Sequence, residues 1–303
     1  MRSFALFLGL FVAGFAIMAL FAWPLYDALT PTFDVKFHRV ANRLGMLALL
    51  IGFILMARRL GVADRRSLGW GLARGPLLRE ASVGLLLGVA TMLPIGVAMF
   101  AFDLRILKPD VAIDAQLLAS IALGGLLTGI TVALIEETFM RGAMHTAIER
   151  ESGAVMAVVL TSLLYAAVHF VGRYRIPVEE LGWDSGWRHV AGTLAQLAEP
   201  LAIIDAFLAL AAVGVLLGVV RTLTGNVAAC IGLHAGWVWV IAFLRETSQP
   251  NESHPARFLL SDFDGVVGWL VLGATLVIGA LLVPFYSRRR SGVIADIASN
   301  QRR

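Results

Sequence analysis

Long apolar runs without a charged residue recur from one end of the chain to the other, and this feature limits the possible folds most. A helix needs about 20 mainly apolar residues to cross roughly 30 Å of hydrocarbon. The runs make 58% of the 303 residues hydrophobic and leave only 15% charged, whereas soluble domains have about 25% charged residues. The sequence therefore predicts an all-α, polytopic membrane helical bundle that forms a single integral domain over residues 1–303.

About eight transmembrane helices are expected when flanking charged residues define the ends of the runs. The first run is longer than the roughly 7–15 residue core of a signal peptide, and the bulky Trp23-Pro24-Leu25-Tyr26 that ends it offers no cleavage site, so we expect a retained span. The predicted spans are 4–26, 40–57, 81–102, 118–146, 152–171, 201–220, 223–244 and 265–287.

The arginine distribution predicts the orientation of the chain in the membrane. An even number of spans places both termini on one side, and the tight arginine clusters at 58–59, 65–66 and 288–290 all fall on that side. Lysine and arginine are enriched in cytoplasmic segments. We therefore expect both termini in the cytoplasm, in a bacterial inner membrane, with 58–80 as a cytoplasmic interfacial segment and 172–200 as an extracytoplasmic loop.

The basic charge and the cysteine content exclude several other classes. The net charge of +4 comes mostly from residues at the ends of apolar runs, which membrane orientation explains without a nucleic-acid partner. Cys230 is the single cysteine, so an intramolecular disulfide and a cysteine-rich metal site are both excluded. We expect Cys230 to pack inertly.

A cluster of ionisable residues, Glu136-Glu137-x-x-x-Arg141, lies inside one predicted span. Each such side chain costs roughly 2.5–3.5 kcal/mol on insertion scales, so the cluster indicates a function. Glu137 and Arg141 share a helix face, in the order that favours an ion pair, while Glu136 is rotated by about 100° from Glu137. We predict that Glu137 and Arg141 balance each other and that Glu136 acts as a general base. The structural alternative is an Arg-Glu ion pair that only holds two helices together.

Two later spans each contain a histidine. Tyr165 and His169 lie one helical turn apart in the first, and His234 lies in the second. A single buried histidine is more often a packed core residue than a ligand or catalyst, but two histidines with a carboxylate pair favour a site. We predict Glu136, His169 and His234 as the catalytic residues. The remaining candidates are expected to be bystanders: His145, His189 and His254.

These motifs, in this order and each in an apolar span, resemble the CPBP family of intramembrane endopeptidases over residues 118–244. The family includes the type II CAAX prenyl endopeptidases and the bacteriocin-processing, Abi-like proteins. The resemblance implies that Glu136 activates the attacking water. It implies that His169 assists Glu136 or binds a metal, and that His234 stabilises the oxyanion or is another metal ligand. Glu137 and Arg141 would brace the site.

Two positions depart from the pattern of this family. Tyr165 stands where Phe is usual, which adds a hydroxyl, and Val238 stands where Asn is usual, four residues after His234. Valine has no hydrogen-bond donor, so an oxyanion hole that uses this amide is absent or rebuilt, for example by Trp237 Nε1. Loss of one such donor costs a protease roughly 2.7–4 kcal/mol of transition-state stabilisation. Tyr165 and Trp237 are therefore possible secondary site residues.

The leading hypothesis is an intramembrane endopeptidase, a hydrolase that cleaves a membrane-associated protein or peptide within the lipid bilayer. Zinc or another divalent metal held by Glu136, His169 and His234 would match a three-ligand catalytic site, but the same groups can also work without metal. The alternative is a weak or inactive member of the same scaffold that acts as an immunity or membrane scaffold protein, which Val238 favours. An ion-coupled transporter would require inverted repeats and broken spans, and the sequence shows neither.

Overall fold

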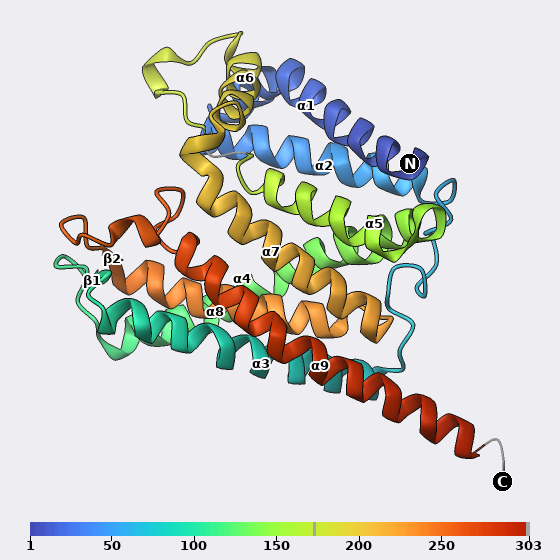
Figure 1. Ribbon diagram of the computed structural model, residues 1–303. Helices are drawn as coiled ribbons and strands as arrows, with labels where there is room; N and C mark the ends of the chain where they lie inside the picture. Colours follow the sequence, from blue (N-terminus) through green and yellow to red (C-terminus); the bar gives the residue numbers. More distant parts are fainter. Residues whose placement is uncertain (172–173, 301–303) are drawn as a thin grey trace.

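The computed structural model describes residues 1–171 and 174–300, and the side chains of 196–197 and 290–300 lie outside this description. The described chain is almost entirely helical (Figure 1). Its α-helices are α1 (Arg2–Leu29), α2 (Phe37–Ala57), α3 (Arg74–Ala101), α4 (Ala115–Glu137), α5 (His145–Val168), α6 (Ser185–Leu197), α7 (Pro200–Thr224), α8 (Ala228–Thr247) and α9 (Trp269–Asn300). Shorter elements are β1 (Arg105–Leu107), η1 (Thr138–Met144), η2 (Val178–Glu180), β2 (Ser248–Pro250) and η3 (Arg257–Leu259).

The predicted class of an all-α membrane bundle is confirmed. The described residues contain seven helices that are long and apolar enough to cross a membrane. One of them is the continuous run of α4, η1 and α5, which is 54 residues long. At 1.5 Å per residue a straight helix of this length would measure about 81 Å, more than twice the hydrocarbon thickness. The run must therefore bend.

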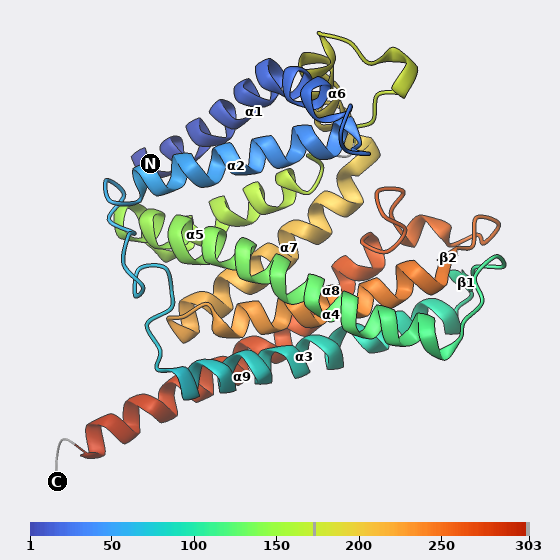
Figure 2. The ribbon, with the colours of Figure 1, turned by 180° about the vertical axis from the view of Figure 1, so that it is seen from behind.

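The bend lies at Gly153, which has φ 84° and ψ 165°. Only a residue without a Cβ adopts this backbone conformation readily. The chain reverses there, so the rest of α5 returns in the opposite direction and packs against η1 (Figure 2). The 54-residue run thus supplies two of the eight predicted spans. The predicted end of the fourth span at residue 146 was wrong, because the helix continues to the glycine.

Four glycines bring α3 and α8 into backbone contact. A Cβ on Gly84 would lie 2.5 Å from the carbonyl oxygen of Ala229, and one on Gly236 would lie 2.6 Å from that of Leu85. Such small-x-x-x-small pairs allow close approach of membrane helices. The four glycines of this interface are Gly84, Gly88, Gly232 and Gly236. Their packing fixes the depth and rotation of α8, which carries His234.

The two ends of the bundle differ in structure. Both chain termini lie at one end, and the small sheet of β1 and β2 lies at the other (Figure 1). The strands pair antiparallel, with Arg105 opposite Pro250. Arg105 is buried, and its guanidinium donates to the carbonyl oxygens of Leu244 at 3.0 Å and Ser248 at 2.7 Å. A cation at the carbonyl end of a helix is favourable, so Arg105 caps α8 and ties the two connections together.

The two segments predicted as connections are more structured than expected. Region 172–200 contains η2 and α6, and α6 packs so closely on α1 that a Cβ on Gly186 would meet the Ala19 carbonyl oxygen. The helical pattern of α6 was not predicted because tryptophans and charged residues interrupt its apolar periodicity. Of the predicted segment 58–80, the part from Arg74 onward belongs to α3.

Candidate active site

The reversal at Gly153 places Glu136 and His169 at the same depth. The two residues are separated from Gly153 by nearly equal stretches of chain, one before it and one after it. In antiparallel helices joined by a tight turn, such positions lie side by side. The continuous helix with its turn at Gly153 therefore brings the two residues to the same level.

The helix changes to π geometry over η1, directly after the two glutamates. A π-bulge leaves backbone groups without their usual helical partners and often occurs at functional sites. Here the Arg141 carbonyl oxygen accepts a 2.9 Å hydrogen bond from Arg221 Nε of α7. On the opposite side, Trp70 Nε1 donates to Thr138 Oγ1 at 3.2 Å. Residues from two distant segments thus hold this turn in place.

Glu137 is the buried hub of the site. Its Oε1 accepts a hydrogen bond from Arg141 Nη1 at 3.1 Å and one from His234 Nδ1 at 2.9 Å. The side chains of Glu137 and Arg141 are both fully buried. Arg141 Nη2 also donates to the Gly214 carbonyl oxygen at 3.3 Å. The predicted ion pair between Glu137 and Arg141 is present. His234 of another helix also bonds Glu137, and residue spacing within one helix could not predict this contact.

Glu136 keeps more freedom than Glu137. Its side chain is 34% exposed, and its Oε2 lies 4.0 Å from His234 Nε2. This oxygen is buried and makes no hydrogen bond within the described part of the chain. Since Arg141 is engaged by Glu137, Glu136 is the carboxylate that can accept a proton from a bound water.

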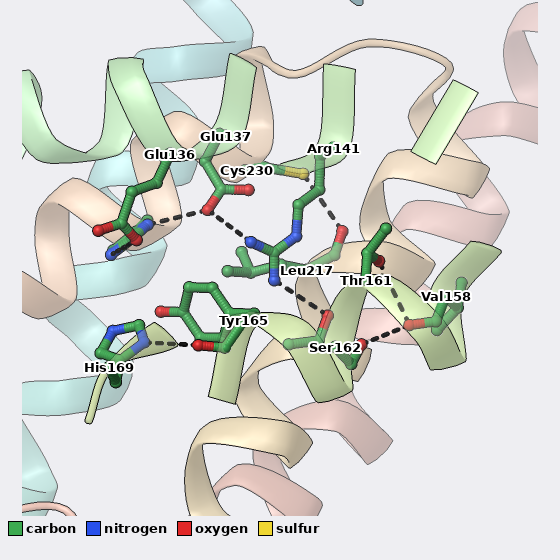
Figure 3. Close-up of polar contacts among 12 residues, drawn as sticks. Glu136, Glu137, Arg141, Val158, Thr161, Ser162, Tyr165, His169, Leu217 and Cys230 are labelled. Atoms are coloured by element: carbon green, nitrogen blue, oxygen red, sulfur yellow. Dashed lines mark hydrogen bonds and ion pairs between the residues drawn. The ribbon is translucent and has the colours of Figure 1, made fainter. Parts of the chain in front are cut away.

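His169 is oriented by its own helix. Its Nδ1 donates to the Tyr165 carbonyl oxygen at 2.7 Å, so in the neutral ring Nε2 carries the free lone pair. The Tyr165 ring packs against the imidazole with centroids 4.5 Å apart, and Arg141 Cζ lies 4.5 Å from the centroid of the same ring. Figure 3 shows Glu136 and His169 on one side of the site, with the Tyr165 hydroxyl directed toward them.

A cavity of about 550 Å³ reaches the two histidines, a volume within the range of small-ligand sites. Tyr165, His169 and His234 line its deep part. Its walls include apolar side chains of α7 and of the region around α9, among them Leu210, Val213, Val267 and Val271. Exposed Arg245 and Glu246 line its other part. These two residues lie in the last turn of α8, close to β2, so this part of the cavity lies toward the end of the bundle away from the termini.

Trp237 and Val238, one helical turn after His234 on α8, differ in their hydrogen-bonding groups. Val238 lines the cavity and supplies only methyl groups. Trp237 also lines the cavity, but its Nε1 donates to Thr91 Oγ1 at 3.0 Å. The indole N–H that we expected as a replacement donor is therefore already used, and that expectation was wrong for this conformation.

The predicted triad does not have the arrangement of a metal site. Within the described ranges, no group of three or more His, Cys, Asp or Glu side chains is placed to hold a metal ion. His234 directs Nδ1 to Glu137 and Nε2 toward Glu136. A metal held by the three-ligand pattern stays a prediction, and the chemistry below is written for the side chains of the protein alone.

The other histidines lie away from the cavity. His145 is buried near Thr222 and Glu149, with its Nε2 3.4 Å and 3.8 Å from their oxygens. His189 Nε2 lies 3.1 Å from Asn42 Oδ1. Cys230 is buried and donates to the Leu217 carbonyl oxygen at 3.3 Å. Sequence reasoning missed Arg221, whose Nε bonds the Arg141 carbonyl oxygen; its place in the last turn of an apolar helix was the available signal.

Comparison with known protein families gave a match to the middle of the chain. Residues 118–240, less than half of the chain, match the family described as type II CAAX prenyl endopeptidase Rce1-like. The matched range contains both glutamates, Arg141 and both histidines of the site. Neither the curated proteins nor the solved structures gave a match.

Proposed function

We propose that this protein is an intramembrane endopeptidase of the Rce1-like family that uses Glu136 as its general base, because residues 118–240 match the model of that family. The observation that supports this assignment most is that the carboxylates of Glu136 and Glu137 have different surroundings. Glu137 Oε1 is bonded to Arg141 and His234, whereas Glu136 is 34% exposed and Figure 3 shows it on the same side of the site as His169.

The proposed reaction begins with a water held between Glu136 and His169. Nε2 of His169 accepts one hydrogen bond from the water, and the Glu136 carboxylate removes its other proton. The water oxygen forms a bond to the carbonyl carbon of the substrate while the π electron pair moves to the carbonyl oxygen. When the tetrahedral intermediate collapses, the C–N bond breaks and the leaving nitrogen takes the proton from Glu136.

His234 and Arg141 control the charge around this base. Two carboxylates and one guanidinium leave one negative charge, and a protonated His234 would balance it while bonded to Glu137. Its Nε2 would then face Glu136 at the observed 4.0 Å. Charges held in place before the reaction begins stabilise developing charge without reorganisation. We propose that the positive charge of His234 balances the change in charge of Glu136 during the reaction.

The substrate that fits this site is a membrane-associated protein or peptide. The apolar walls suit an apolar segment, and the charged residues at the opening suit the polar chain that follows it. With both termini in the cytoplasm of a bacterial cell, the opening would face the extracytoplasmic side. We propose that the scissile segment enters from that side.

Cleavage assays with purified protein test this function. A fluorogenic peptide library is incubated with the wild type, with Glu136→Gln and with His169→Ala, each with and without chelator. Glu252→Gln, in an exposed loop, is the matched carboxylate control. We expect Glu136→Gln to lower the rate by about 10²- to 10⁴-fold and the control to match the wild type. Equal rates in all variants would reject the protease, and loss of activity in chelator would reject the metal-free route.

The second candidate is a scaffold or immunity protein built on the same fold. Val238 favours it, because this side chain lines the cavity and has no donor for an oxyanion. A protein of this kind would bind membrane peptides without cleaving them. The library assay separates the two, since binding without cleavage in the wild type, at rates equal to Glu136→Gln, supports the scaffold.

A further inference from the structure

The Tyr165 hydroxyl is a polar group on the cavity wall that the mechanism above leaves without a role. Tyr165 is only 2% exposed and lines the deep part of the cavity. Its hydroxyl is not among the buried side-chain atoms that lack a hydrogen-bond partner, so this oxygen is accessible from the cavity. A group that enters the cavity can therefore accept its hydrogen bond.

The contacts of the ring do not require the hydroxyl. The ring packs on His169, with centroids 4.5 Å apart, and on His234, with centroids 6.1 Å apart. Arg141 Cζ lies over its face at 4.5 Å. A phenylalanine would make all three contacts equally well, because they use only the aromatic ring. The oxygen is the part of this side chain that has no structural explanation.

Three other neutral donors around the cavity are occupied. Trp237 Nε1 donates to Thr91, Ser120 Oγ donates to the Leu117 carbonyl oxygen, and Thr275 Oγ1 donates to the Val271 carbonyl oxygen. The Tyr165 hydroxyl is directed toward Glu136 and His169 (Figure 3). It therefore stands next to the position where the attacking water and the substrate carbonyl must meet.

We propose that the Tyr165 hydroxyl is the oxyanion donor of this protease. As the water oxygen adds to the substrate carbon, the carbonyl oxygen gains the electron pair of the broken π bond and accepts the hydrogen bond from Tyr165. The phenol keeps its proton throughout. The positive charge of Arg141 over the ring polarises the O–H bond and strengthens the donor. The hydroxyl thus supplies the donor that Val238 lacks, and the assignment rests on the proposed endopeptidase function.

Kinetics of Tyr165→Phe test the proposal on the best peptide from the library. We expect kcat to fall by about 10²- to 10³-fold, as for loss of one oxyanion donor, with little change in KM. The melting temperature and the shape of the pH profile should not change, because the ring contacts and the base stay in place. Tyr26→Phe, a buried tyrosine outside the site, is the matched control and should retain wild-type rates.

A rescue variant separates a donor from a packing role. Val238 faces the same cavity, so Val238→Asn in the Tyr165→Phe background offers a new N–H donor. Recovery of at least about tenfold in kcat is expected for a restored donor. A Tyr165→Phe enzyme within threefold of the wild type would overturn the Tyr165 assignment alone. A wild type that hydrolyses no peptide would instead overturn the proposed function.

Discussion

The buried pair of Glu137 and Arg141 makes a sharp prediction about stability. The change Arg141→Met removes the guanidinium that bonds Glu137 at 3.1 Å and the Gly214 carbonyl oxygen at 3.3 Å. Both side chains of the pair are fully buried, so Glu137 would keep a buried charge with only His234 beside it. Breaking a buried pair by removing one partner costs about 3–5 kcal/mol. We expect Arg141→Met to lower the free energy of unfolding by that amount.

Removing the charge on both partners should cost less than removing one. In Glu137→Gln/Arg141→Met, the glutamine oxygen can still accept the hydrogen bond from His234, and no uncompensated carboxylate is left. Coupling between residues in contact is about 0.5–3 kcal/mol, so the double variant should be more stable than Arg141→Met by about this amount. Both variants lose the same packing of the arginine side chain. A double variant that is more stable than Arg141→Met therefore indicates an effect of charge.

Reversible unfolding in mixed micelles, followed by circular dichroism during a titration with SDS, measures these differences. Arg245→Met is the control, because Arg245 forms an exposed ion pair with Asp264 at 3.1 Å and such pairs are worth about 0–1 kcal/mol. An Arg141→Met protein as stable as this control would refute the reasoning. So would a double variant less stable than Arg141→Met.

Three further predictions concern other parts of the molecule. Burial lowers the pKa of His189 from its usual 6.5 to about 4, and the charges of His38 and Arg175 lower it further. Between pH 4 and 6.5 the unfolded chain therefore binds more protons than the folded protein. The free energy of unfolding should fall as the pH drops from 6.5 to 4. His189→Gln should flatten this dependence in the same SDS titration, and an unchanged slope would count against it. Gly84→Leu should separate α3 from α8 and lower stability by about 1–3 kcal/mol or more, whereas Gly75→Leu, where a Cβ meets open space, should have little effect on the melting temperature. Glu246→Cys should react in intact cells with a maleimide that cannot cross the membrane, while the buried Cys230 gives no background; labelling only after lysis would contradict the predicted orientation.

Hydropathy and local spacing determined the fold class and part of the site. The apolar runs predicted a polytopic helical bundle, because the cost of burying backbone in lipid allows only helices and closed barrels. The spacing of Glu137 and Arg141 predicted their ion pair, since residues four apart meet on one helix regardless of the rest of the fold. The sequence also indicated that Glu136, His169 and His234 belong together, although it could not say which atoms face each other.

Tertiary structure alone decided how the residues of different helices meet. The turn at Gly153 sets the depth of His169 against Glu136, and the glycine contacts of α3 and α8 set the rotation of His234. These contacts brought His234 to Glu137 as well as Glu136, occupied the Trp237 donor and left the Tyr165 hydroxyl directed into the site. Periodicity gives the face of a single helix, whereas the depth and rotation of one helix relative to another depend on packing between segments far apart in the chain.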